Sequence, residues 1–201
     1  MIISATDRKT SILPFGEQIA RVAEAGPDML ILTERDLLPE EYRELAAACM
    51  SECAGNNVQF CADKFADAAR ELGIKTLHMD LEDLKTSRPD GFDRILTTVR
   101  NEREAIDAEA AGASILIFRD VFDLTCKSCR NAKGLAMLRF LLGTVDIPVI
   151  GAGGIYPDVF YDVLGSEAAG VCMRDGFMRT KDPSSVVRAY REAEERARKL
   201  R

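Results

Sequence analysis

One unit recurs four times along the chain: an amphipathic segment runs into a glycine, and a short apolar run follows. The four glycines are Gly26, Gly73, Gly112 and Gly170. The apolar runs after them cover residues 29–32, 76–79, 114–118 and 171–173. A glycine at the end of an amphipathic segment is typical of a helix C-terminus, so each unit predicts a helix, a glycine cap and a strand.

Four further apolar runs lie between these units, at residues 2–5, 58–61, 95–99 and 148–151, which makes eight candidate strands. Helical spacing of apolar side chains separates most of them. A chain of 201 residues, 47% of them hydrophobic, supports one sizeable core, so we expect a single domain over residues 1–201. Turn-forming residues at 86–91 leave little room for the fourth helix, which we expect to be reduced or missing.

The apolar runs do not alternate with polar residues, and this pattern is typical of parallel strands that are buried on both faces. An open, doubly wound sheet and a closed (βα)8 TIM barrel both contain such strands. No glycine-rich nucleotide loop follows the first strand, where Thr6-Asp7-Arg8-Lys9 stands instead, and its absence favours the barrel. Because a TIM barrel carries its active site at the carboxyl ends of the strands, residues just after each apolar run are the candidates for function.

Charge and cysteine content limit the partners and the location. The 27 Lys and Arg against 33 Asp and Glu give a net charge of -6, whereas binding to duplex nucleic acid requires neutralisation of phosphates. No apolar run approaches the roughly 20 residues of a membrane span. Six cysteines without a secretion signal indicate reduced core thiols. We therefore expect a soluble cytoplasmic protein without nucleic-acid or membrane partners, and the sequence leaves open whether it forms a homo-oligomer.

A glycine-rich turn after the seventh candidate strand suits an anion. Residues 151–155 read Gly-Ala-Gly-Gly-Ile and precede an expected helix start at Tyr156. Exposed amides of Gly153 and Gly154, together with a helix dipole, favour a phosphate at this place in a barrel; alternatively, the glycines only permit a tight turn. Arg174, at the end of the eighth strand, either contacts the same anion or pairs with Asp175.

Carboxylates follow two neighbouring candidate strands. Asp63 follows the third strand, and Asp80, Glu82 and Asp83 follow the fourth. Neighbouring strand ends meet at one rim of a barrel, so these residues suggest a site for a hard cation. Magnesium needs only one or two carboxylates when substrate phosphates complete its shell. The alternative is that Glu82 and Asp83 only cap the element that follows.

Three basic residues follow other candidate strands. Lys127 lies in the longest expected loop, residues 121–129, while Arg35 and Arg8 follow the second and first strands. Together they predict a basic inner ring that captures an anion; taken singly, each is a solvated charge.

Two other features, a C-x-x-C motif and the single histidine, lack the further ligands that a zinc site needs. Cys126 and Cys129 form an isolated C-x-x-C without a second pair, and His78, the single histidine, sits inside an apolar strand. We interpret His78 as a packed strand residue rather than a general base.

With these residues placed, the chain from Ile2 to Pro183 resembles the thiamine phosphate synthase and TenI superfamily of small TIM barrels. The segments similar to family motifs are Thr6-Asp7-Arg8, residues 32–36, Cys61-Ala62-Asp63, residues 78–83, residues 121–127 and Gly153-Gly154-Ile155. None of these motifs is specific alone, and the resemblance depends on their order and spacing.

The resemblance implies a transferase of thiamine biosynthesis that joins an aminopyrimidine methyl diphosphate to a thiazole phosphate and releases diphosphate. Small phosphorylated metabolites are the implied partners. The implied residue roles are a Mg²⁺ site at Asp63 and Asp83, diphosphate binding by the catalytic residues Arg35 and Lys127, and substrate or phosphate binding by Gly153, Gly154, Arg174 and Thr98. Fixed cations and a metal act most strongly where charge develops on departing oxygens, so these roles suit the reaction.

The chain also departs from the family motifs. The departures are Thr33 for arginine, Ala62 for asparagine, Asp80 for glycine, Leu81 for glutamine, Leu124 and Cys126 for two threonines, and Asp175 for serine. They predict weak Mg²⁺ binding and low synthase activity. Two alternative functions therefore stay open: a TenI-like thiazole tautomerase, in which Asp120 stands where that branch has its histidine, and a non-catalytic binder of a phosphorylated metabolite.

Overall fold

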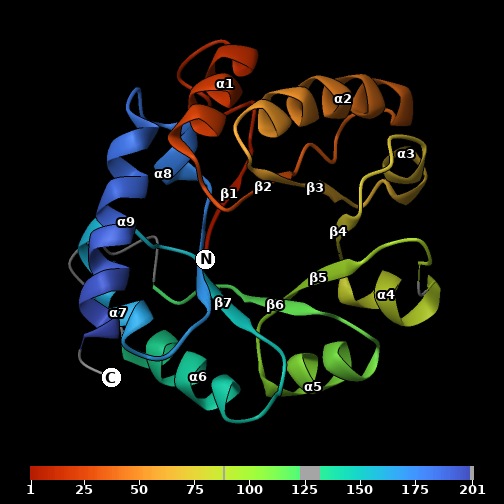
Figure 1. Cartoon of the computed structure of the whole chain (residues 1–201). Helices are drawn as coiled ribbons and strands as arrows, with labels where there is room; N and C mark the ends of the chain where they lie inside the picture. The colour runs from red at the N-terminus through yellow and green to blue at the C-terminus, as the bar shows by residue number, and fades with distance from the viewer. Residues whose placement is uncertain (88, 123–131, 200–201) are drawn as a thin grey trace.

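The structure is a computed structural model that describes residues 1–87, 89–122 and 132–199 (Figure 1). Eight parallel strands form a closed barrel in chain order, with the last strand beside the first. The strands are β1 (Ile2–Ala5), β2 (Met29–Leu32), β3 (Gln59–Asp63), β4 (Thr76–Met79), β5 (Arg94–Val99), β6 (Ile115–Phe118), β7 (Val149–Ala152) and β8 (Gly170–Met173). This architecture confirms the predicted TIM barrel and rules out the open sheet.

Helices surround the ring of strands on its outside (Figure 1). They are α1 (Phe15–Ala25), α2 (Pro39–Gly55), α3 (Ala66–Glu71), α4 (Leu81–Ser87), α5 (Glu102–Ala110), α6 (Ala132–Leu142), the 3-10 helix η1 (Pro157–Val159), α7 (Phe160–Leu164), α8 (Asp175–Met178) and α9 (Pro183–Arg198). The fourth helix has only 7 residues, which confirms the reduced α4. None of the helices in the described ranges is long and apolar enough to cross a bilayer.

The recurring glycines have two different structural roles. Gly26, Gly73 and Gly112 adopt positive φ angles of 72°, 70° and 98° at the ends of helices, as a glycine cap requires. Gly170 does not cap a helix, because it is the first residue of β8. A Cβ atom there would lie 1.7 Å from the carbonyl oxygen of Met1, so this glycine allows β8 to approach the N-terminal backbone where the barrel closes.

Alternate residues of each strand divide the core into two clusters. One fills the barrel and includes Ile3, Met29, Leu96 and Ile150, and the other lies between the barrel and the helices. The inner cluster fills the barrel below the carboxyl ends of the strands, and residues at those ends line an open space.

The described cysteines support the expectation of reduced thiols. Cys49, Cys53, Cys61 and Cys172 are free and buried. Burial raises the pKa of Cys49, Cys53 and Cys172 to about 12, so these thiols stay protonated and unreactive at neutral pH. Cys126 and Cys129 lie outside the described residues.

Candidate functional site

A cavity of about 430 Å³ opens at the carboxyl ends of the strands, and all eight strands or the residues just after them line it. Ile31, Ile117 and Cys172 from the inner core cluster give it an apolar floor. The charged residues among its described lining are Arg35, Arg119, Arg174, Asp63, Asp120 and Asp175. These three arginines balance the three aspartates, so the described part of the lining carries no excess positive charge.

Asp63 is the last residue of β3, and its side chain is fully buried. One carboxylate oxygen, Oδ2, lies 2.5 Å from Arg35 Nε, and the other, Oδ1, lies 2.7 Å from both Arg35 Nη2 and His78 Nδ1. Burial opposes ionisation of Asp63, but the hydrogen bonds from Arg35 and His78 outweigh burial and lower its pKa below 3.8. Asp63 is therefore ionised at neutral pH.

Arg35 binds a second carboxylate as well. Its Nη1 lies 2.9 Å and 2.8 Å from the two oxygens of Asp80, which directly follows β4. The hydrogen bond to Asp63 raises the pKa of Arg35, so the guanidinium is charged. It makes four hydrogen bonds to carboxylates, whereas an arginine has five N–H donors in all. Little donor capacity is left for a diphosphate.

His78 points into the barrel and connects two polar side chains. Its Nδ1 contacts Asp63, and its Nε2 lies 2.8 Å from the hydroxyl oxygen of Thr98 on β5. The ionised carboxylate favours a proton on Nδ1, so Nε2 accepts the hydrogen bond that Thr98 donates. The Asp63-His78-Thr98 chain lines the cavity. His78 is a packed strand residue, as the sequence suggested, but it also belongs to the site.

The position of His78 between two apolar residues of its strand could have indicated this role. Leu77 and Met79 pack outward against the helices, so the residue between them must face the barrel interior. A polar residue near the carboxyl end of a barrel strand, on its inward face, is a candidate site residue.

Two other arginines of the cavity pair with their chain neighbours. Arg119 Nε lies 3.0 Å from Asp120 Oδ2, and Arg174 Nε lies 3.3 Å from Asp175 Oδ1. Of the two alternatives predicted for Arg174, the structure contains the pair with Asp175. Both arginine side chains are about half exposed, at 46% and 53%, so these pairs are weak.

The glycine turn after β7 packs against the segment that follows β6. Gly153 has a φ of 87° and Gly154 a φ of 61°. A Cβ atom on Gly153 would lie 2.6 Å from the backbone nitrogen of Asp120, and one on Gly154 would lie 2.7 Å from the carbonyl oxygen of Phe122. Both glycines line the cavity, but close backbone packing is sufficient to explain why glycine stands at both positions.

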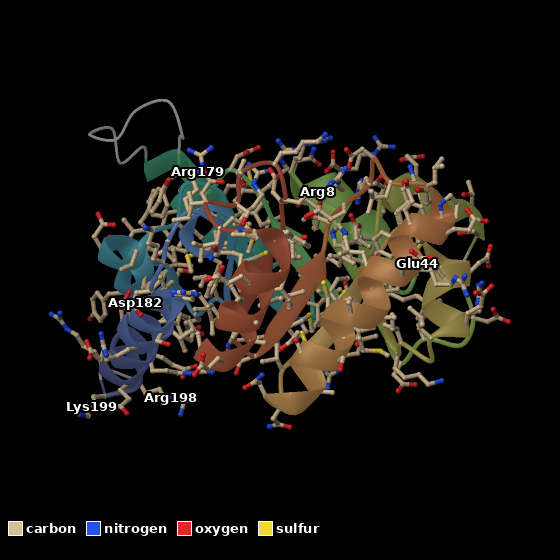
Figure 2. All side chains as sticks on the ribbon, turned by 90° about the horizontal axis from the view of Figure 1, so that it is seen from above. Arg8, Glu44, Arg179, Asp182, Arg198 and Lys199 are labelled. Carbon is tan, nitrogen blue, oxygen red and sulfur yellow. The ribbon has the colours of Figure 1, made fainter. Side chains whose placement is uncertain are left out.

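The three residues of the predicted basic ring do not come together as a ring among the described residues. Arg8 is not among the residues that line the cavity, because its guanidinium contacts Glu34 at 2.9 Å and Asp36 at 2.6 Å. Figure 2 shows it at the same edge of the molecule as Arg179. Arg35 lines the cavity but is held by carboxylates, and Lys127 lies outside the described residues. The described residues therefore do not form a free basic ring.

Asp83 and Ala62 lie away from the cavity lining. Asp83 is exposed in the first turn of α4, together with Glu82. Acidic side chains there interact favourably with the positive end of the helix dipole. This position agrees with the alternative that these two residues serve the following helix. Ala62 is fully buried in the outer core cluster and is not among the residues that line the cavity. Thr33 does line the cavity, and its hydroxyl donates to the carbonyl oxygen of Thr6.

The family model and the curated relatives indicate one family. A family model described as thiamine monophosphate synthase matches residues 2–177. The thiamine-phosphate synthase of Coprothermobacter proteolyticus is 26% identical over 185 residues, which cover 90% of this chain and 87% of that protein. The thiamine-phosphate synthase of Moorella thermoacetica is 28% identical over 190 residues, covering 92% and 90% of the two chains.

A solved structure has the same fold over almost its whole length. The thiamine phosphate pyrophosphorylase of Pyrococcus furiosus superposes with a TM-score of 0.84 and 22% sequence identity, covering 98% of this chain and 96% of that chain. At this identity the likeness supports the barrel fold alone.

Proposed function

Since the chain belongs to the thiamine monophosphate synthase family, we propose that it is a transferase of thiamine biosynthesis. It joins an aminopyrimidine methyl diphosphate to a thiazole phosphate and releases diphosphate. The observation that supports this proposal is the cavity itself, which combines an apolar floor for flat heterocycles with the polar residues Thr98, Arg174 and the Gly153–Gly154 turn at its rim.

The reaction exchanges one bond for another. The bond between the methylene carbon and the diphosphate oxygen breaks, and its electron pair leaves with the diphosphate. The ring nitrogen of the thiazole then supplies an electron pair to the methylene carbon. The protein has to hold both rings in line over the floor of the cavity and stabilise the departing negative charge.

Thr98 orients the pyrimidine in this proposal. Its hydroxyl proton is directed to His78, so the lone pairs of its oxygen are free to accept a hydrogen bond from an amino group. The amino group of an aminopyrimidine is such a donor. Asp63 fixes the imidazole from the other side, and the Asp63-His78-Thr98 chain thus acts as a rigid acceptor for the substrate.

Arg119 and Arg174 bind the phosphorylated groups. Each is paired with a neighbouring aspartate in an exposed ion pair, which contributes at most about 1 kcal/mol, so an anionic substrate can compete for the guanidinium. The turn at Gly153 and Gly154 lies beside them in the same cavity and binds the thiazole phosphate. Arg35 is bound by Asp63 and Asp80 and has little donor capacity left for a phosphate, and Lys127 remains a predicted diphosphate ligand.

Magnesium is the cofactor that the family resemblance implies, but the residues proposed for it do not fit as they stand. Asp63 has both oxygens engaged by Arg35 and His78, and Asp83 does not line the cavity. Over the described ranges, no three His, Cys, Asp or Glu side chains are grouped to hold a metal ion. No step of the reaction is therefore assigned to a metal bound by Asp63 and Asp83.

A tautomerase is the second candidate function, because Asp120, which stands where the TenI branch has its histidine, lines the cavity. In this alternative Asp120 moves protons on a thiazole ring. The cytoplasmic location, the small-metabolite partners and the formation of a homo-oligomer stay predictions.

The test is direct assay of the purified chain with both substrates and MgCl₂, following thiamine phosphate by mass spectrometry. We expect product at a rate well below that of the Moorella thermoacetica synthase assayed beside it. If the Moorella enzyme turns over and this chain forms no product, the transferase proposal fails. NMR of a thiazole phosphate substrate then separates a tautomerase, which changes its spectrum with time, from a binder, which only shifts it.

A further inference from the structure

The guanidinium of Arg35 occupies the position between two carboxylates that come from neighbouring strand ends. All four oxygens of Asp63 and Asp80 are directed to this one group, at distances between 2.5 Å and 2.9 Å. Asp63 ends β3, and Asp80 comes directly after β4, which pairs with β3. Two carboxylates that converge in this way have the oxygen ligands that a hard divalent cation prefers.

We propose that Arg35 is a built-in cation that occupies the space between Asp63 and Asp80, keeps divalent metal ions out of it, and makes this side of the cavity independent of metal. The role concerns the chain's own charge balance, and it holds whichever ligand fills the cavity.

Burial makes the arrangement around Asp63 difficult to replace. The carboxylate of Asp63 is fully buried, so it needs a positive partner at close range, and Arg35 contacts both of its oxygens. His78 Nδ1 also forms a hydrogen bond with one of these oxygens, Oδ1. A metal ion would have to displace a bidentate guanidinium and compete with the imidazole for the same carboxylate.

Asp80 holds Arg35 from the opposite side. It stands where the motif that residues 78–83 resemble has glycine, a residue without a side chain that could contact Arg35. Through its Nη1 the guanidinium binds both oxygens of Asp80. Without Asp80, the outer half of the guanidinium would be free to turn toward a ligand or to leave room for a metal ion.

The accessible position of the cluster allows a test with an added metal. The side chains of Arg35 and Asp80 are 36% and 49% exposed, so an ion in solution can reach them. Mn²⁺ is a suitable paramagnetic reporter, because it prefers the same oxygen ligands as Mg²⁺. Its binding to the full chain is measured by electron paramagnetic resonance.

Five proteins are compared: the unaltered chain, Arg35→Gln, Asp80→Asn, the double variant Arg35→Gln with Asp80→Asn, and the control Arg21→Gln. Arg21 is 44% exposed and pairs with Glu17 on α1, and it does not line the cavity, so its loss removes the same charge elsewhere. We expect Arg35→Gln to bind Mn²⁺ at least about tenfold more tightly than the unaltered chain, because two carboxylates become available as ligands. The double variant and the control should show no such gain.

Two results would overturn the proposal. One is an unaltered chain that binds Mn²⁺ as tightly as Arg35→Gln and loses the ion on Asp80→Asn. The other is a folded Arg35→Gln variant that gains no Mn²⁺ binding. If circular dichroism shows Arg35→Gln to be unfolded, the Tm of the unaltered chain decides: a rise with millimolar Mn²⁺ that Asp80→Asn abolishes contradicts the proposal, and an unchanged Tm supports it.

Discussion

Asp63 connects side chains from three parts of the barrel, and its protonation affects the whole group. Its carboxylate binds Arg35 and His78, while its backbone nitrogen donates to the hydroxyl of Tyr42 on α2 at 2.8 Å. The ionised form is the one that these partners require. Stability should therefore depend on pH through this residue.

The first prediction concerns Asp63→Asn. The pKa of Asp63 is lower in the folded chain than its unfolded value near 3.8, so its stabilising effect is present above that pH and is lost as the pH falls below it. The asparagine variant should lose about 1–3 kcal/mol of unfolding free energy at neutral pH, because a buried donor of His78 or Arg35 loses its acceptor. Urea unfolding over a pH series measures both effects.

In acid, the unaltered chain should approach the variant in stability. A constant difference between the two proteins across the whole pH range would contradict this account of Asp63.

The second prediction concerns Thr98, whose hydroxyl meets His78 Nε2 at 2.8 Å. Thr98→Val keeps the shape of the side chain but removes the hydroxyl, so thiamine phosphate formation should fall by roughly 100-fold, as when one preorganised polar contact is removed from an active site. Thr98→Ser keeps the hydroxyl and should retain most of the activity. Equal losses in the two variants would mean that the threonine methyl, rather than the hydroxyl, matters.

At the scale of elements, the turn after β7 and the segment after β6 form one packed unit. Val121 and Phe122 donate backbone hydrogen bonds to the carbonyl oxygens of Ala152 at 3.0 Å and Gly153 at 3.2 Å. The glycine positions at 153 and 154 are thus set by the neighbouring backbone as well as by any ligand. A side chain at Gly153 would push on this segment before it blocked a phosphate.

The third prediction is that Gly153→Ala destabilises the chain by about 1–3 kcal/mol, because alanine is strained at this positive φ and its Cβ would clash with Asp120. Gly16→Ala is the matched control. Gly16 lies in the first turn of α1 with no atom within 4 Å of a Cβ, so alanine there should not destabilise the chain. Thermal unfolding gives the Tm of both variants. Equal Tm values for Gly153→Ala and Gly16→Ala would show that the packing does not constrain Gly153.

The charge balance of the cavity belongs to the scale of the whole molecule. The chain has a net charge of -6, and every arginine in the described cavity lining has a carboxylate partner. These carboxylates reduce the attraction for a diphosphate compared with a cavity of free arginines. Low activity would follow from this balance even if every substrate contact were in place.

The fourth prediction adds one positive charge to the cavity. Thr33 lines it, so Thr33→Arg, the residue of the family motif, should tighten the binding of inorganic diphosphate by about tenfold or more, since a charge-assisted contact contributes about 1.5–3 kcal/mol. Isothermal titration calorimetry measures the change. Ala62→Asn, the other motif residue, should not help and should destabilise the chain, because Ala62 is buried in the outer core.

Repeating the titration at higher salt distinguishes an electrostatic gain in diphosphate affinity from a change in the shape of the cavity. Added salt screens the new charge and should weaken an electrostatic gain. A Thr33→Arg variant whose diphosphate affinity equals that of the unaltered chain would mean that the anion does not bind at this end of the cavity.

The sequence by itself determined the order of the elements and the family. Apolar runs and helix-ending glycines depend on neighbours within a few residues, so local periodicity predicted the eight strands and the short α4 without reference to contacts. The same local information placed Asp63, Arg35 and Gly153 at or after the carboxyl ends of strands, and the family resemblance added Thr98; all four line the cavity.

Only the tertiary structure decided how these residues pair. Arg35 lies 28 positions from Asp63 and 45 from Asp80, while His78 lies 20 positions from Thr98, so each contact depends on the register of strands distant in the chain. Periodicity identifies the face on which a side chain lies but not the partner that it reaches. Whether Arg35 meets a diphosphate, a metal-binding carboxylate or two carboxylates at once is determined by side-chain geometry across the closed barrel.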